Sequence, residues 1–140
     1  MCAAICARVG GGGARVGFDI RPGSYTTDRL IEVLNELHCF LDGDKVTLVW
    51  DNLPAHTSRK MRAWTRQQRS WLVVEYLPPY APDLNPVETL WTNLKHQELA
   101  NLASDNLGEV VAAAHYGIQW IRSAWWLPYA FARRCGISFC

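Results

Sequence analysis

The sequence predicts an α/β fold with mixed strand directions. Two short apolar stretches, residues 3–9 and 14–20, flank a run of four glycines, which is typical of a β-hairpin. From residue 26 onward, apolar strands alternate with segments whose apolar residues recur at helical spacing. Strands that alternate with helices favour a sheet flanked by helices.

Length and composition indicate one globular domain over residues 1–140. A chain of 140 residues buries about two thirds of its unfolded surface. The composition is 49% hydrophobic and 19% charged, which excludes a disordered chain. The net charge of +1 gives no whole-chain attraction for a polyanion, so a nucleic-acid partner must be argued from local patches.

The cysteines and the apolar segments indicate where the protein resides. Five cysteines form no Cys-x-x-Cys pair and are odd in number, which favours reduced thiols over a disulfide framework or a zinc site. No stretch resembles a signal peptide, and none is long enough to cross a bilayer. We expect a cytoplasmic protein with no membrane partner.

The first predicted helix follows the hairpin and leads into a strand. Thr26 or Thr27 caps it, and its apolar stripe comprises Leu30, Val33, Leu34, Leu37 and Leu41. It ends near residues 42–44, and residues 46–50 form a continuous apolar run. Such a run is expected of a strand buried on both faces.

Four further helical segments follow. Thr57 or Ser58 caps a basic helix that extends to about residue 68, and residues 71–77 form a second buried strand. Asn85 at the N-cap, Pro86 at the first position and Glu88 at the third open a helix that runs to about residue 99. Residues 106–121 and 126–135 are the last two helical segments, the first with Leu107, Val110, Val111, Ala114 and Ile118 facing inward.

Two acids follow apolar elements in adjacent strand–helix units. Asp51 ends a central strand, where open α/β sheets place their sites, although Asp-Asn also makes a turn through its own hydrogen bonds. Glu88 lies in the first turn of its helix, where it can equally serve as a capping acid. For each acid considered alone, the structural role is the favoured interpretation. Together they can project from one sheet edge, where clustered carboxylates hold hard divalent cations for phosphoryl transfer.

The residues around both acids resemble a known family. The motifs are VWDNLPAH and LPPYAPDLNPVETLWTNLK, with 36 residues between the two acids. They resemble the catalytic domain of DDE transposases of the mariner superfamily, in its bacterial insertion-sequence branch. The resemblance implies a ribonuclease-H-like mixed sheet flanked by helices, with Asp51 as the second acid and Glu88 as the third. It implies two Mg²⁺ or Mn²⁺ ions, no small-molecule cofactor, and transposon ends and target DNA as partners.

The chain departs from this pattern at its start. The family places its first acid on a strand that precedes the hairpin, and Asp19 is the only acid in the hairpin itself. Asp19 lies on the wrong strand for that role, so a surface carboxylate is favoured over a ligand. We therefore expect a domain that lacks its first strand and its helix-turn-helix region. Such a chain is expected to expose strand edges and to be inactive alone.

Several other residues are candidate DNA contacts. They are Asn52, His56, Arg59, Lys60 and Lys95. His56 is equally compatible with a role in the loop, and exposed arginines and lysines are most often simply solvated. Most tryptophans are expected in the core, with Trp91 beneath the site, whereas base stacking by Trp125 or Trp126 has no support from the sequence.

Two functions of different classes follow from these observations. The first is transposase-type DNA cleavage and strand transfer by a two-metal mechanism, carried out only when another segment or chain completes the site. The second is a non-catalytic remnant that binds DNA or pairs with an intact transposase through an open sheet edge. A nuclease that uses Asp19 as its first acid is a third, weaker hypothesis.

Overall fold

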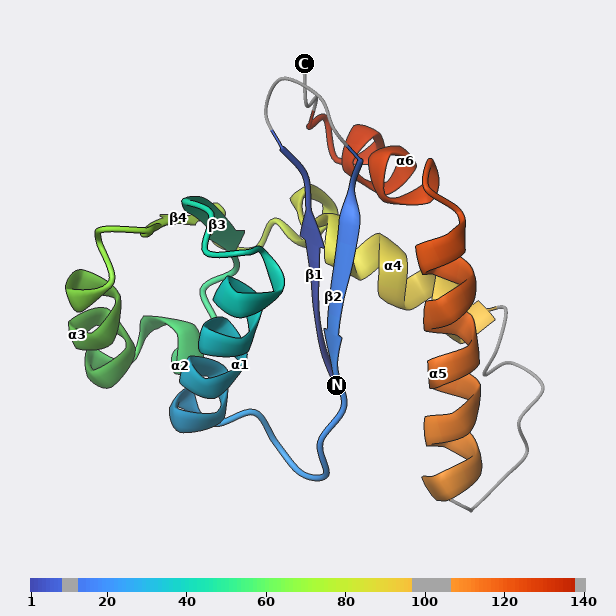
Figure 1. Cartoon of the computed structure of the whole chain (residues 1–140), viewed down its shortest axis with the longest axis horizontal. Coiled ribbons are helices and arrows are strands. Elements are labelled where there is room, and N and C mark those ends of the chain that lie inside the picture. Colours follow the sequence, from blue (N-terminus) through green and yellow to red (C-terminus); the bar gives the residue numbers. More distant parts are fainter. Residues whose placement is uncertain (9–12, 97–106, 138–140) are drawn as a thin grey trace. The chain divides into compact units, whose positions relative to one another are not determined.

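The computed structural model describes residues 1–8, 13–96 and 107–137. The chain divides into two compact units (Figure 1). The first unit comprises residue 1 and Arg21–Pro82, and the second comprises Cys2–Ile20 and Asp83–Cys140.

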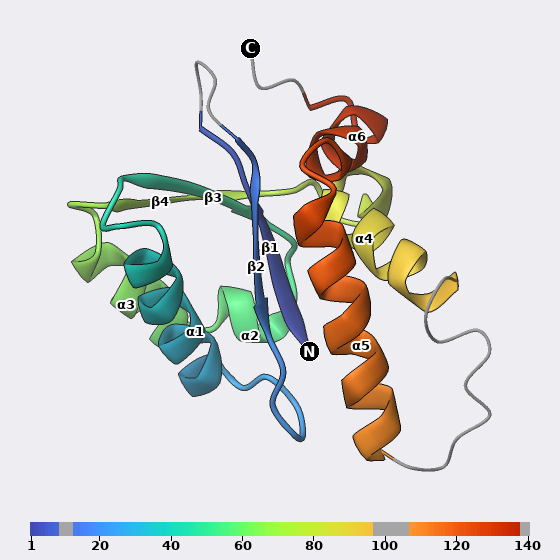
Figure 2. The ribbon, with the colours of Figure 1, turned by 45° about the vertical axis from the view of Figure 1, so that its right-hand side comes forward.

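The first unit is built on two parallel strands. Strand β3 (Val46–Trp50) pairs with β4 (Leu72–Tyr76), with Val46 opposite Leu72 and Trp50 opposite Tyr76. Helices α1 (Thr27–Phe40), α2 (Pro54–Thr57) and α3 (Arg59–Gln67) lie on the same side of this pair (Figure 2). The crossover from β3 to β4 runs through α2 and α3, as parallel pairing requires.

Within the described part of the chain, helices cover one face of this strand pair. Val49 and Val73 are 49% and 52% exposed, whereas Trp50 and Leu72 are buried. The expectation of strands buried on both faces is therefore wrong. Three helices cover one face of two strands, and the side chains of alternate residues project from the opposite face.

Hydroxyl side chains begin the helices of the first unit as expected. Thr26 caps α1 by accepting a hydrogen bond from the Arg29 amide, and Ser58 caps α3 by accepting one from the Met61 amide. The short helix α2 was not predicted. It separates from α3 at Ser58, where the backbone is extended (ψ 152°).

The second unit is built on an antiparallel hairpin. Strand β1 (Cys2–Cys6) pairs with β2 (Arg15–Asp19), with Cys2 opposite Asp19 and Cys6 opposite Arg15. The expected hairpin is confirmed. Val9 and the first three glycines of its turn lie in residues 9–12, outside the described part. Helices α4 (Pro86–Leu94), α5 (Leu107–Ser123) and α6 (Leu127–Arg134) complete this unit (Figure 1).

The core of the second unit joins the hairpin to all three helices. Its buried residues are Val16, Leu90, Ile121, Leu127 and Phe131, against which Ala3, Ile5, Phe18, Trp91 and Ala124 pack. One face of the hairpin supplies alternate residues to this core, as the strand period requires. The rings of Phe18 and Trp91 meet edge to face at 5.4 Å.

The helix boundaries mostly follow the predictions. Asn85 caps α4 by accepting from the Val87 amide, with Pro86 at the first position. Helix α4 ends at Leu94, short of the predicted residue 99, and residues 97–106 lie outside the described part. The prediction for Leu107 falls on a side chain that is also outside it, whereas Ala114 and Ile118 are buried as predicted.

The strands form two sheets rather than one. The predicted mixed directions are confirmed, because one pair is antiparallel and the other parallel. The expectation that the fold lacks its first strand stays a prediction.

Candidate active site

The first candidate acid lies where two parallel strands end. Trp50 and Tyr76 are opposite each other at the last positions of β3 and β4, so both strands end at the same edge of the sheet. Asp51 follows Trp50 directly. Carboxyl ends of parallel strands are where open α/β sheets place ligands, because the chain turns there and exposes polar groups.

The Asp51 carboxylate is held by two donors on one of its oxygens. Oδ1 accepts hydrogen bonds from the Leu53 amide at 3.1 Å and from His56 Nδ1 at 2.7 Å. The side chain of Asp51 remains 38% exposed. Oδ2 makes no hydrogen bond or ion pair within the described residues. One oxygen is thus fixed, and the other is available to a ligand.

The His56 ring is itself held in place. It stacks on the Trp50 indole with a centroid separation of 4.0 Å and an interplanar angle of 5°, and its side chain is 14% exposed. Because the carboxylate can only accept, Nδ1 carries the proton in this contact. His56 was predicted as a DNA contact, but its observed partner is the candidate ligand Asp51.

Two hydrogen bonds tie the turn after β3 to the end of β4. Asn52 Nδ2 donates to the Leu77 carbonyl oxygen at 2.6 Å, and the Tyr76 hydroxyl donates to the His56 carbonyl oxygen at 3.2 Å. The Thr27 hydroxyl, at the start of α1, contacts the Ala55 carbonyl oxygen at 3.2 Å. The turn that carries Asp51 is therefore fixed from both strands and from a helix. The amide of Asn52 is used in this turn.

The second candidate acid opens a helix in the other unit. Glu88 lies in the first turn of α4, and its side chain is exposed. The Glu88 amide donates to the Asn85 carbonyl oxygen at 3.0 Å, but the carboxylate makes no hydrogen bond or ion pair within the described ranges. The reciprocal bond of a capping box is not formed, so the carboxylate is available.

The basic candidates are distributed over both units. Arg59 and Lys60 lie in the first turn of α3, and Lys60 pairs with Asp28 of α1. Both are exposed, as are the other basic residues of this helix. Lys95 follows α4 directly and is exposed, seven residues after Glu88 and so about 10 Å along the helix axis. The structure groups Asp51, Asn52 and His56, and it places Glu88 in the first turn of α4 and Lys95 at its C-cap.

The hairpin carries the remaining acid and two thiols. Asp19 lies opposite Cys2, on the face of β2 opposite to Val16 and Phe18. Burial, with a smaller contribution from Asp19, raises the pKa of the Cys2 thiol, and burial also raises the pKa of Cys6. All four cysteines of the described part are free thiols, which agrees with the prediction.

The donors suit a hard divalent cation in kind but not yet in number. Asp51 Oδ2 and the Glu88 carboxylate are oxygen ligands of the type that Mg²⁺ and Mn²⁺ prefer. No group of three or more His, Cys, Asp or Glu side chains is gathered within the described residues.

Comparison with known proteins identifies the family. Residues 2–110 match the family described as DDE superfamily endonuclease, and this range contains both Asp51 and Glu88. No curated protein matches the chain. Nucleases of the family generally use divalent metal ions, and DNA is the substrate that the family implies. No helix in the described part is long and apolar enough to cross a membrane. Because the match covers most of its length, this chain belongs to the DDE superfamily endonuclease family.

Proposed function

We propose that the chain contributes two of three acids to a transposase-type DNA strand-cleavage and strand-transfer site. In the first step water attacks phosphorus at an element end, and the bond from phosphorus to the 3′ oxygen breaks. The 3′-hydroxyl so formed then attacks a target phosphodiester and displaces its 3′ oxygen. The number of phosphodiester bonds is unchanged in this second step.

The observation that carries the proposal is the state of the Asp51 carboxylate. Oδ1 is fixed by two donors while Oδ2 is left without a partner among the described residues. An acid that only closed its own turn would need the Leu53 amide alone. The additional bond from a half-buried, stacked His56 is typical of a ligand that is oriented by its neighbours.

Each residue has a distinct role in the proposed site. Asp51 and Glu88 hold two Mg²⁺ or Mn²⁺ ions together with a third carboxylate. When bound, such ions supply an activated water and offset the charge that develops on phosphorus. His56 orients Asp51, and Asn52 fixes the turn to β4. Lys95 and Arg59 are exposed cations that suit DNA phosphates.

The third carboxylate is proposed to come from outside these 140 residues. The motif order of the family places it on a strand before the hairpin, and Asp19 lies on the wrong strand to replace it. The completing strand is supplied by an upstream segment or by another transposase chain. The 140-residue chain alone is then inactive.

A reconstitution experiment tests the proposal. The chain is co-expressed with the upstream segment, and Mn²⁺-dependent nicking of element-end DNA is measured on a gel. Asp51→Asn and Glu88→Gln are each expected to lower the rate by at least about 100-fold, because each removes a metal ligand. Glu75→Gln on β4 and Glu109→Gln in the first turn of α5 are matched controls that retain activity. Nicking that survives either ligand substitution would overturn the assignment.

The exposed strand face favours a second candidate function. Val49 and Val73 project from the uncovered face of β3 and β4, and such apolar strands invite pairing or packing with another chain. A non-catalytic remnant that pairs with an intact transposase would use this surface. Co-purification with a transposase that persists in Asp51→Ala, with no cleavage in the reconstituted wild type, would favour this function over the first.

A further inference from the structure

The corner between α5 and α6 exposes two adjacent tryptophan side chains. Trp125 and Trp126 are 71% and 52% exposed. Single exposed apolar residues need no explanation, but a group of them marks an interaction surface. This corner lies beyond residue 110, outside the range that matches the endonuclease family.

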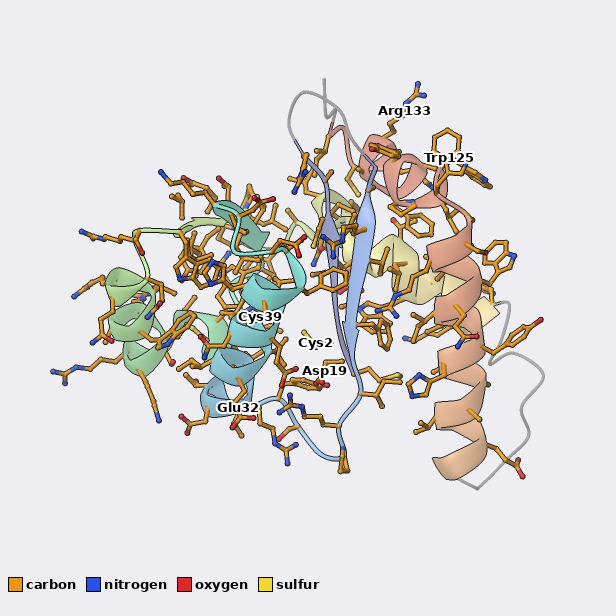
Figure 3. All side chains as sticks on the ribbon, in the orientation of Figure 1. Cys2, Asp19, Glu32, Cys39, Trp125 and Arg133 are labelled. Atoms are coloured by element: carbon orange, nitrogen blue, oxygen red, sulfur yellow. The ribbon has the colours of Figure 1, made fainter. Side chains whose placement is uncertain are left out.

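The residues of α6 divide between a buried face and an exposed face because of helical spacing. Leu127 and Phe131, four residues apart, face the core of the second unit. The opposite stripe of α6 therefore faces outward, and together with Trp125 it lines an open hollow of about 450 Å³. The lining residues, called the aromatic patch here, are Trp125, Trp126, Tyr129, Ala130 and Arg133. Figure 3 shows Trp125 and Arg133 projecting outward from this end of the unit.

The segment of the chain that carries the aromatic patch has basic residues and no acidic ones. Residues 110–140 contain three arginines, at positions 122, 133 and 134, and no Asp or Glu. Arg133 lines the hollow directly, and Arg134 beside it is exposed. The surface therefore combines flat π faces with positive charge, which suits the bases and the phosphates of a nucleic-acid strand.

We propose that the aromatic patch binds unpaired bases of single-stranded DNA. Bases stack on the indoles of Trp125 and Trp126, and the Arg133 guanidinium contacts a backbone phosphate. Stacking of this kind tolerates any base, because every base has a π face. The site goes beyond the proposed cleavage chemistry, since it uses neither candidate acid and no metal ion.

Binding of a labelled oligothymidylate to the full chain tests the proposal, in EDTA and at low salt. We expect quenching of tryptophan fluorescence and a rise in anisotropy, with a duplex of equal length bound several-fold more weakly. Trp125→Ala should weaken binding about 10-fold, and Trp125→Phe should restore most of it, because a smaller ring still stacks. Arg133→Gln should lower the slope of log K against log salt by about 0.7, the loss of one phosphate contact.

A matched control and three possible outcomes decide the matter. Trp120→Ala removes an exposed indole of α5 that does not line the hollow, and it should leave the affinity unchanged. Wild-type affinity in Trp125→Ala, or equal affinity for duplex with the same dependence on Trp125, would overturn the proposal. The proposal would also be overturned if Trp125→Ala lost self-association in sedimentation but bound the oligonucleotide as the parent does. That result would identify a second copy of the chain as the occupant of the patch. Because the assay contains no divalent metal, its result is independent of whether the cleavage site is assigned correctly.

Discussion

Replacing His56 by alanine should destabilise the first unit measurably. The substitution removes a hydrogen bond to a carboxylate, worth about 1.5–3 kcal/mol, and a ring stacked on Trp50, worth about 0.5–1.5 kcal/mol. Asp51 is 38% exposed, so water replaces part of the lost bond and lowers its contribution. We expect a loss of about 2 kcal/mol in the free energy of unfolding, near the middle of the range for single substitutions.

The assay is urea unfolding followed by circular dichroism. His56→Asn keeps an N–H donor close to the position of Nδ1, so it should recover part of the loss, while His115→Ala on the exposed face of α5 should stay within about 0.5 kcal/mol of the parent. In the reconstituted protein, His56→Ala should also weaken Mn²⁺ binding about 10-fold, as the loss of a residue that orients a ligand does. Unchanged stability and unchanged Mn²⁺ affinity in His56→Ala would refute the role given to this ring.

Three further predictions concern the second unit. Leu90→Ala should cost about 3–5 kcal/mol in unfolding free energy, because Leu90 is fully buried, whereas Leu84→Ala, at a 40% exposed position, should cost less than about 1 kcal/mol in the same urea titration. Asn85→Ala removes the N-cap of α4 and should cost about 1 kcal/mol, measured in the same way. Burial raises the pKa of the Cys2 and Cys6 thiols in the folded chain, so the unfolded state loses its thiol protons first and stability should fall as the pH rises above about 9.0. Replacing both thiols by alanine should remove that part of the decline, and a decline of the same size in this variant would contradict the assignment.

Local signals in the sequence predicted most of the secondary structure. The caps at Thr26, Ser58 and Asn85 all form, because a hydroxyl or amide before a helical stripe satisfies amides that have no other partner. The strands appear where apolar runs lie between turn residues. Short α2 was missed because four residues are too few to show a helical period.

Burial and pairing could not be predicted in the same way. An apolar run such as residues 46–50 is compatible with burial on two faces or on one, and the number of neighbouring layers decides between them. Here helices cover one face only, so Val49 is exposed. Most tryptophans were expected in the core, but Trp125 and Trp126 are exposed. Both lie in the short connection that precedes α6, and their rings stay outside the core.

The site was predicted in its residue types but not in its contacts. Asp51 and Glu88 were identified from motif and position, and both lie where a strand ends or a helix begins. The bond between His56 and Asp51 joins residues five apart through a turn, and no periodicity reports such a contact. The sequence feature that goes with this contact is Trp50, which immediately precedes Asp51 and stacks on the His56 ring.

The measurement that most directly tests the central claim is a double-mutant cycle on Mn²⁺ affinity. Asp51→Asn, Glu88→Gln and the double variant are compared with the parent in isothermal titrations of the reconstituted protein. If both acids hold the same ions, each single variant loses at least about 10-fold in affinity and the double variant binds little worse than either. Losses that add fully in the double variant, or wild-type affinity in either single variant, would show that the two acids do not share a metal site.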